Sequence, residues 1–362
     1  MGEEEDKPLA ERHLLKGREW MAKQQFREAE KEFRAALELE SENAEIRFSL
    51  ADLLDRCGRV EEAIAEFQRA VALSPNLAEG HSRLGFLLHQ KQRLDSAIAA
   101  YREALRLRPR DAVTTNNLGL ALHEKGATDE ALEKFREAIR LRPDYAPAHT
   151  NLGVALSSKG EHALAIEELR EAIKLDPDDA PPHNGLGSAL EKTGDLDGGI
   201  AEYREALRLD PQYTDAAYNL GNALRVKGKL DEALGYLQAV VGDRPQDAGA
   251  YFSLGVAFEG KGMADEAEAA FRRALELKPD HVEAHNHLGV ILHKRGYLPE
   301  AVDEYVAAIL LQPENGELHQ NLGAALQQQG KVKQAFAAYQ RACQLGQQES
   351  CKRIQGPRRN PK

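Results

Sequence analysis

Prolines recur along this chain at a constant interval. From Pro75 to Pro313 a proline stands every 34 residues. The eight members of the series are Pro75, Pro109, Pro143, Pro177, Pro211, Pro245, Pro279 and Pro313. A fixed period of this length indicates stacked repeats, in which each unit contacts only its neighbours. We therefore expect an array of small units and not one globular core.

We number the positions of each 34-residue unit so that the proline is position 32. In this numbering, other positions also keep the same residue type from unit to unit. Position 8 is Gly or Ala, position 20 is Ala or Gly, and position 24 is Phe, Tyr or Leu. Ten units fit the pattern, although Ser41 and Gln347 replace the proline in the first and last. Their predicted bounds are 10–43, 44–77, 78–111, 112–145, 146–179, 180–213, 214–247, 248–281, 282–315 and 316–349.

The spacing inside one unit predicts two helices. In the unit 112–145, Thr115, Leu118 and Leu122 lie on one face of a helix. Gly126 is expected to end that helix, because glycine tolerates the left-handed conformation. A second helix follows and ends before Pro143, since the residue before a proline is pushed out of the α region. A single hairpin of this kind cannot bury its apolar face, so the units must stack.

These positions resemble the tetratricopeptide repeat, whose pattern is Leu-Gly, then Ala, an aromatic residue and Pro. The resemblance covers residues 10–349. It implies an all-α solenoid of ten stacked helix-turn-helix units that forms a right-handed superhelix. Residues 1–9 are then expected to be an N-terminal tail, and residues 350–362 a short cap with a basic tail.

The charge balance bears on the class of partner. The chain has a net charge of −11, with 59 acidic and 48 basic residues. This argues against nucleic acid or an anionic membrane as the main partner, because there is no global basic field to attract phosphate. No apolar run approaches the length that spans a bilayer, and the acidic residues 1–6 do not resemble a signal peptide. We expect a cytoplasmic protein with protein or peptide partners.

The sequence shows no constellation of catalytic residues. Its glycines are repeat positions and not part of a phosphate-binding strand-loop-helix motif. Six of the twelve histidines share position 4 on the packing stripe, and no carboxylate or cysteine pattern joins them at zinc spacing. They are His13, His81, His149, His183, His285 and His319. The prediction is a non-enzymatic protein without cofactor or metal.

Asparagines on the first helices are the candidate binding residues. In proteins that this chain resembles, the second face of the first helix lines a concave groove and holds peptides. Position 6 supplies Asn117, Asn151, Asn219 and Asn321, and neighbouring positions add Asn116, Asn184, Asn222 and Asn286. An amide offers an acceptor and two donors, which suits the backbone of an extended peptide. The alternative is that these amides bond locally and fix helix packing.

Two further functions follow from resemblance or from shape. The Asn-Leu-Gly units resemble the repeat arm of O-linked N-acetylglucosamine transferases, which implies a substrate-selecting arm of a multi-component enzyme. A chaperone-binding clamp has Lys at position 5 of one unit and Asn at position 6 of the next. This pattern is absent, since Tyr218 and Ser253 stand at these positions in the units 214–247 and 248–281. Self-assembly through open solenoid ends is the third possibility.

Two cysteines, Cys343 and Cys351, lie near the end of the sequence, in a stretch that is similar to the end of a Sel1-like repeat. In such repeats a pair like Cys343 and Cys351 can bridge two helices. The two cysteines can therefore form a disulfide or stay free. We expect free thiols, because a reducing compartment favours them.

Glycines make residues 180–247 the stretch predicted to be least stable. Gly185, Gly198 and Gly235 lie inside expected helices, and each costs about 1 kcal/mol relative to Ala. The stretch is either ordinary drift within a tolerant repeat or a flexible joint. If the backbone at Gly198 is helical, Gly198→Ala should stabilise the protein.

Overall fold

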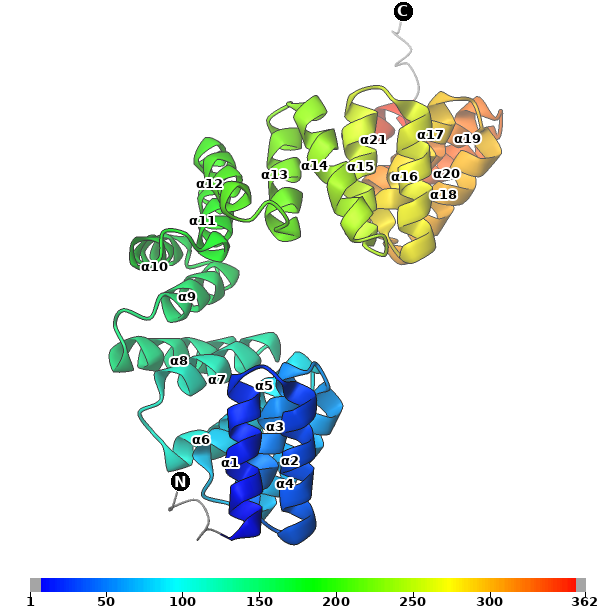
Figure 1. The fold of residues 1–362 in the computed structure, drawn as a ribbon. Helices are drawn as coiled ribbons and strands as arrows, with labels where there is room; N and C mark the ends of the chain where they lie inside the picture. The colour runs from blue at the N-terminus through cyan, green and yellow to red at the C-terminus, as the bar shows by residue number, and fades with distance from the viewer. Residues whose placement is uncertain (1–7, 356–362) are drawn as a thin grey trace, which may run out of the picture. The chain divides into compact units, whose positions relative to one another are not determined.

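The computed structural model describes residues 8–355, and in this range the chain forms 21 α-helices and no strand (Figure 1). The all-α fold class predicted from the sequence is confirmed. Each predicted unit holds one antiparallel pair of helices. The first helices are α1 (Leu9–Ala22), α3 (Ala44–Arg56), α5 (Ala78–Gln90), α7 (Ala112–Glu124), α9 (Ala146–Ser158), α11 (Ala180–Lys192), α13 (Thr214–Val226), α15 (Ala248–Gly260), α17 (Val282–Lys294) and α19 (Gly316–Gln328).

The second helices occupy positions 17–30 of each unit, apart from a slightly shorter last one. They are α2 (Phe26–Leu39), α4 (Val60–Leu73), α6 (Leu94–Leu107), α8 (Thr128–Leu141), α10 (His162–Leu175), α12 (Leu196–Leu209), α14 (Leu230–Asp243), α16 (Ala264–Leu277), α18 (Leu298–Leu311) and α20 (Val332–Gln344). A short helix, α21 (Gln348–Gln355), follows the last pair.

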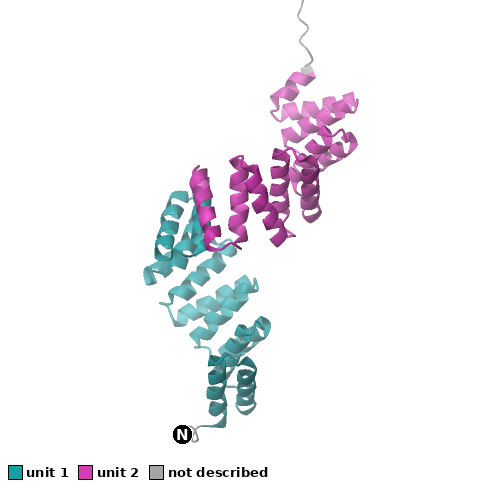
Figure 2. Ribbon diagram, turned by 45° about the horizontal axis from the view of Figure 1, so that its top comes forward, with its two compact units in different colours: residues 1–189 teal, residues 190–362 magenta. Residues whose placement is uncertain are grey.

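The chain separates into two compact units, residues 1–189 and 190–362 (Figure 2). The boundary falls within α11 and therefore inside the glycine-containing stretch 180–247. We refer to the two parts as the N-terminal unit and the C-terminal unit. Most of the predicted N-terminal tail and of the basic C-terminal tail lies outside the described residues.

The helix hairpins close around the aromatic residue at position 24. In the pair α7–α8, Phe135 is completely buried, as are Ala131 and Ala138 on the same helix. A Cβ atom on Gly119 would come within 2.7 Å of the Phe135 ring. In this unit, glycine at position 8 therefore lets the two helices approach closely. Gly126, which ends α7, has a φ of 88°, the left-handed conformation predicted from the sequence.

In residues 180–247, the effect of replacing a glycine on stability depends on its surroundings. At Gly198, a Cβ atom would lie 2.4 Å from the Asp195 carboxylate. That carboxylate accepts a hydrogen bond of 2.8 Å from the Gly198 N–H and so caps α12. Alanine would disturb this cap, so the structure does not support stabilisation by Gly198→Ala. The gain is expected instead at Gly235 in α14, where a Cβ atom would have no neighbour within 4 Å.

The last two cysteines are bonded. The sulfur atoms of Cys343 and Cys351 form a disulfide between α20 and α21, with Cα atoms 4.8 Å apart. The preference for free thiols at these positions is thus wrong for this structure, while Cys57 is a free, exposed thiol. Ile354 of α21 packs against the cluster around Tyr339, and Ser350 is completely buried. The disulfide therefore fixes a helix that covers part of the last hairpin.

Candidate peptide-binding face

The first helices of the N-terminal unit expose a continuous row of side chains. Helix α5 contacts α7, and α7 contacts α9. We call the outward side of these three helices the first-helix face and define it by Phe86, Asn117, Leu120, Asn151 and Val154. Phe86 and Val154 are 40% and 41% exposed, and the other three are partly exposed.

Two of the predicted asparagines on this face form a bridge between repeats. The Asn151 amide donates a hydrogen bond of 3.0 Å to the Asn116 side-chain oxygen of the preceding unit. Asn116 is only 3% exposed. Its own amide approaches the Asn117 oxygen at 3.5 Å, which is too long for a strong bond. Asn116 thus orients Asn151, while the Asn117 amide group and the Asn151 oxygen are not used by these contacts.

The same bridge recurs in the C-terminal unit. Asn321 donates to the Asn286 oxygen at 2.9 Å. Asn222 instead donates to the Tyr218 carbonyl of its own helix at 3.1 Å. Asn184 and Asn219 are partly buried and have interactions of their own. The structure therefore brings together two pairs of the predicted residues and gives at least part of the asparagine set a local packing role.

Position 9 supplies functional candidates that the asparagine pattern does not reveal. Phe86, Leu120 and Val154 are the position-9 residues of three successive units. Because α5, α7 and α9 are neighbours, their apolar side chains follow one another across the face. The signal was present in the sequence, because position 9 is apolar in three consecutive units.

Histidines at position 4 connect neighbouring units in the structure. His149 contacts the Glu168 carboxylate at 2.7 Å through Nδ1 and the Pro143 carbonyl at 3.1 Å through Nε2. His285 repeats this arrangement with Glu304 at 2.6 Å and Pro279 at 2.9 Å. The Pro143 and Pro279 carbonyls can only accept, so Nε2 donates to them in both histidines. This geometry indicates a structural role for these histidines.

His285 is expected to titrate above its ordinary value. The hydrogen bond to Glu304 raises the pKa of His285 above 6.5, more than burial lowers it. The resulting stabilisation is complete below the pKa of the unfolded chain and is lost as the pH rises through the folded pKa. An NMR titration of the His285 ring should give a midpoint above 6.5 that decreases in Glu304→Gln. A midpoint unchanged by Glu304→Gln would contradict this assignment.

A second polar cluster lies between α15 and α17. The His287 ring contacts the Glu259 carboxylate at 2.7 Å and stacks on Phe271 with 5.3 Å between the ring centroids. The hydrogen bond to His287 lowers the pKa of Glu259, and burial lowers the pKa of His281. His281, His285 and His287, which are close in sequence, have different partners. Within the described residues, no group of three His, Cys, Asp or Glu side chains could hold a metal ion.

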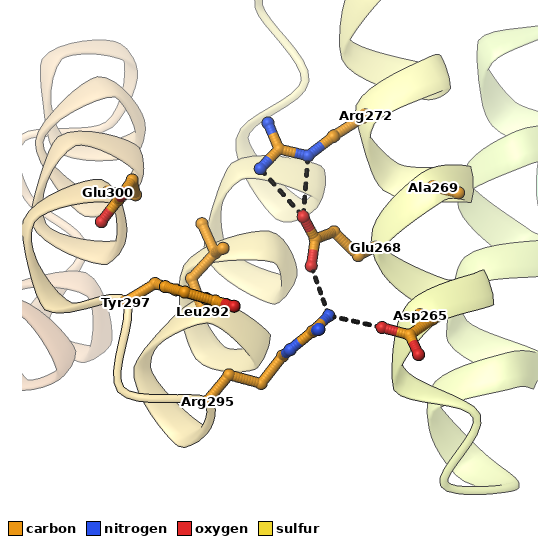
Figure 3. Close-up of a pocket in the computed structure, with 8 residues that line it drawn as sticks. All are labelled: Asp265, Glu268, Ala269, Arg272, Leu292, Arg295, Tyr297 and Glu300. Atoms are coloured by element: carbon orange, nitrogen blue, oxygen red, sulfur yellow. Dashed lines mark hydrogen bonds and ion pairs between the residues drawn. The ribbon is translucent and has the colours of Figure 1, made fainter.

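A surface pocket in the C-terminal unit is occupied by its own ion pairs (Figure 3). Glu268 lies between Arg272, at 2.9 Å, and Arg295, at 2.7 Å. Arg295 also contacts Asp265 at 2.8 Å. Both guanidinium groups are thus neutralised by carboxylates. This pocket offers an anionic ligand no unpaired charge from these arginines, and it does not include the first-helix face.

Large apolar side chains are also exposed on second helices of the C-terminal unit. On α18, Leu310 is 77% exposed and Val306 is 40% exposed. On α20, Val332 and Phe336 are 69% and 50% exposed. Most other units carry Arg, Lys, Gln or Glu at the positions of Val306 and Leu310. In the part of the chain that the structure describes, no helix is both long and apolar enough to cross a membrane.

Comparison with protein families identifies the repeats. A tetratricopeptide repeat profile matches residues 14–78, 184–248, 218–281 and 252–310, which is more than half of the chain. A second repeat profile of the same kind matches residues 87–126, 119–160, 155–194 and 291–330, and a third matches residues 316–348. The chain therefore belongs to the tetratricopeptide repeat family. A search among curated proteins gives no match.

Solved structures share the fold. A chain of the APC/C hetero-tetramer Cut9–Hcn1 is 19% identical, with a TM-score of 0.61, over 83% of this chain and 59% of that chain. MamA from Desulfovibrio magneticus RS-1 is 26% identical over 47% of this chain and 96% of its own, with a TM-score of 0.44. YrrB, described as a TPR protein with an unusual peptide-binding site, is 25% identical over 51% of this chain and 95% of its own, with a TM-score of 0.41.

Proposed function

We propose that this protein is a non-enzymatic scaffold that binds extended segments of partner proteins along the first helices of its repeats. Tetratricopeptide proteins are generally interaction modules without catalysis, and this chain belongs to that family. The observation that carries the proposal is the first-helix face. There, apolar side chains lie on three neighbouring helices, α5, α7 and α9, and two of these helices, α7 and α9, also carry an amide side chain.

The amides of this face suit a peptide backbone. The Asn151 side chain is held by Asn116, so its oxygen has a restricted orientation from which it can accept a peptide N–H. The Asn117 amide group can donate to a peptide carbonyl. Contacts of this kind read the backbone and not the side chains. The face is therefore expected to bind many sequences, with selectivity supplied by the apolar row.

The test uses peptides selected from a random peptide library displayed on phage. For a selected peptide, Asn117→Ala should weaken binding by about fivefold, since a net hydrogen bond contributes about 1 kcal/mol. Its melting temperature should stay close to that of the wild type. Arg136→Ala, on the exposed side of the second helix α8, is the matched control and should bind normally. A library that yields no binders, or an Asn117→Ala protein that melts early and binds normally, would refute the proposal.

The structure changes what is expected of Asn151. The sequence alone suggests that replacing Asn117, Asn151 and Asn219 together would weaken binding by about 3 kcal/mol with little effect on melting. Asn151→Ala, however, leaves the buried Asn116 oxygen without its donor. An orphaned buried polar group costs about 1–3 kcal/mol. A combined variant that contains Asn151→Ala would therefore confuse lost binding with lost stability, and Asn117→Ala is the cleaner variant.

Two other functions remain as alternatives. The resemblance of the Asn-Leu-Gly units to the arm of O-linked N-acetylglucosamine transferases supports a substrate-selecting role, which would need a catalytic domain outside these repeats. Self-association is favoured by the exposure of Leu310 and Phe336 on α18 and α20. Light scattering over a concentration series tests it, because a molar mass that stays at 40.0 kDa at high concentration would exclude it.

A further inference from the structure

The apolar row of the first-helix face has a spacing that selects the conformation of a bound peptide. Phe86, Leu120 and Val154 stand at the same position on α5, α7 and α9. Packed helices lie about 8–10 Å apart. Adjacent apolar sites on this face are therefore about one interhelical distance apart. A ligand that fills them needs side chains that repeat at this interval on one side of its backbone.

Of the two common extended conformations, only polyproline II has this repeat. It rises about 3.1 Å per residue with three residues per turn, so residues i and i+3 project on one side about 9 Å apart. Side chains on one face of a β-strand recur after about 6.6 Å, and next after about 13 Å. Both strand intervals miss the distance between neighbouring helices.

The amides beside the row fit the same conformation. A polyproline II segment makes no internal hydrogen bonds, so its carbonyl groups are free to accept. The Asn117 amide group lies one turn of α7 before Leu120, and Asn151 lies one turn of α9 before Val154. Leu120 and Val154 thus each have an amide neighbour on the same helix. Proteins that bind polyproline II segments use aromatic-lined grooves, and Phe86 supplies one aromatic side chain to this row.

The charge at the α3 end of the row indicates a further feature of the ligand. The Asp52 carboxylate contacts Arg83 of α5 at 3.9 Å, which links α3 to the helix that carries Phe86. The Asp55 carboxylate lies one turn further along α3, is partly exposed, and has no hydrogen bond or ion pair with the described residues, although the charges of Arg83 and Arg56 act on it. Burial raises the pKa of Asp55 despite the nearby charges of Arg83 and Arg56, so a further cation from a ligand would stabilise its charged form. The net charge of −11 attracts basic segments in general.

We propose that the first-helix face binds a polyproline II segment with an apolar side chain at every third residue and a basic side chain at the end that lies over Asp55. This inference rests on the proposed function, and it specifies the partner by its conformation and its pattern of side chains. It commits the face to a proline-rich linear segment of another protein.

Fluorescence anisotropy with synthetic peptides of about twelve residues tests the spacing. One peptide carries leucine at every third position with prolines between. A second has the same composition, with its leucines placed at alternate positions of its central segment. The first should bind at least about tenfold more tightly, because the second peptide presents no leucine to the middle one of three sites when its leucines occupy the outer two. Phe86→Ala should weaken binding of the first peptide by about tenfold. Phe336→Ala, which removes a ring that is 50% exposed on α20, should have no effect.

The charge is tested with arginine at either end of the first peptide, because the direction of the bound chain is open. One of the two peptides should bind at least about threefold more tightly than the other, and Asp55→Asn should abolish the difference. The Asp55→Asn protein should melt no earlier than the wild type, since it loses no hydrogen bond. Equal binding of the two arginine peptides to the wild-type protein would refute the role of Asp55.

The outcomes separate this inference from the proposed function. If both leucine patterns bind equally, the polyproline II spacing is refuted while a peptide-binding face remains. If neither peptide binds but library peptides do, the spacing is again refuted and the function stands. If no peptide of any kind binds, the proposed function fails and this inference fails with it.

Discussion

Replacing Phe135 with alanine is expected to lower the free energy of unfolding by about 3–5 kcal/mol. The ring is completely buried at position 24 of its unit and fills the space above Gly119. Removing it leaves a cavity between α7 and α8. Because a repeat array is stabilised by contacts between neighbours, the loss should also weaken the interfaces with the adjacent units.

Denaturant unfolding of the Phe135→Ala protein measures this effect. Arg136→Ala changes the adjacent, exposed residue of the same helix and should alter stability by no more than about 0.5 kcal/mol. Leu152→Ala, at a buried position of α9 that is 2% exposed, should behave like Phe135→Ala with a cost of about 2–5 kcal/mol. Equal losses for Phe135→Ala and Arg136→Ala would mean that the repeat register is wrong.

Replacing Gly119 with valine is expected to destabilise the protein by about 3 kcal/mol. The cause is the opposite of a cavity. The first added carbon would already lie 2.7 Å from the Phe135 ring, and the ring has no exposed side toward which it could move. The two helices would have to separate. Thermal or denaturant unfolding with a folded-state check by circular dichroism gives the measurement.

Gly235→Val is the matched control for this overpacking effect. Gly235 is also inside a helix, but it is exposed and a Cβ atom there would meet nothing within 4 Å. The same change of residue should therefore alter stability by no more than about 0.5 kcal/mol. If both valine variants were equally destabilised, the cost would not come from the close approach of α7 and α8.

The fold could be predicted from the sequence because each repeat position has one physical function. The prolines end the second helices, Gly126 and its equivalents end most of the first helices, and Gly119 admits the ring of Phe135. These requirements are local, and they are visible in the sequence because the same residue types recur every 34 residues. The repeat pattern did not predict the boundary between the two compact units near residue 189. It also did not predict that Asp195 caps α12. Both features depend on contacts that differ from unit to unit.

The candidate site could be predicted only in part. The sequence identified the asparagines but not which amides bond each other, because Asn116 and Asn151 meet only once two units stack. The sequence also provided no distance between Cys343 and Cys351. The prediction of free thiols was therefore wrong, since the two residues form a disulfide. The apolar row of Phe86, Leu120 and Val154 was accessible to sequence reasoning, since it follows from position 9 alone.

Methyl NMR of the protein bound to a selected peptide tests the peptide-binding face most directly. Binding should shift the methyl signals of Leu120 and Val154 on α7 and α9. The signals of Leu164 on α10 and Val306 on α18, which are exposed on second helices, should stay unchanged. Shifts confined to Leu164 or Val306, with Leu120 and Val154 unaffected, would contradict the assignment of binding to the first helices.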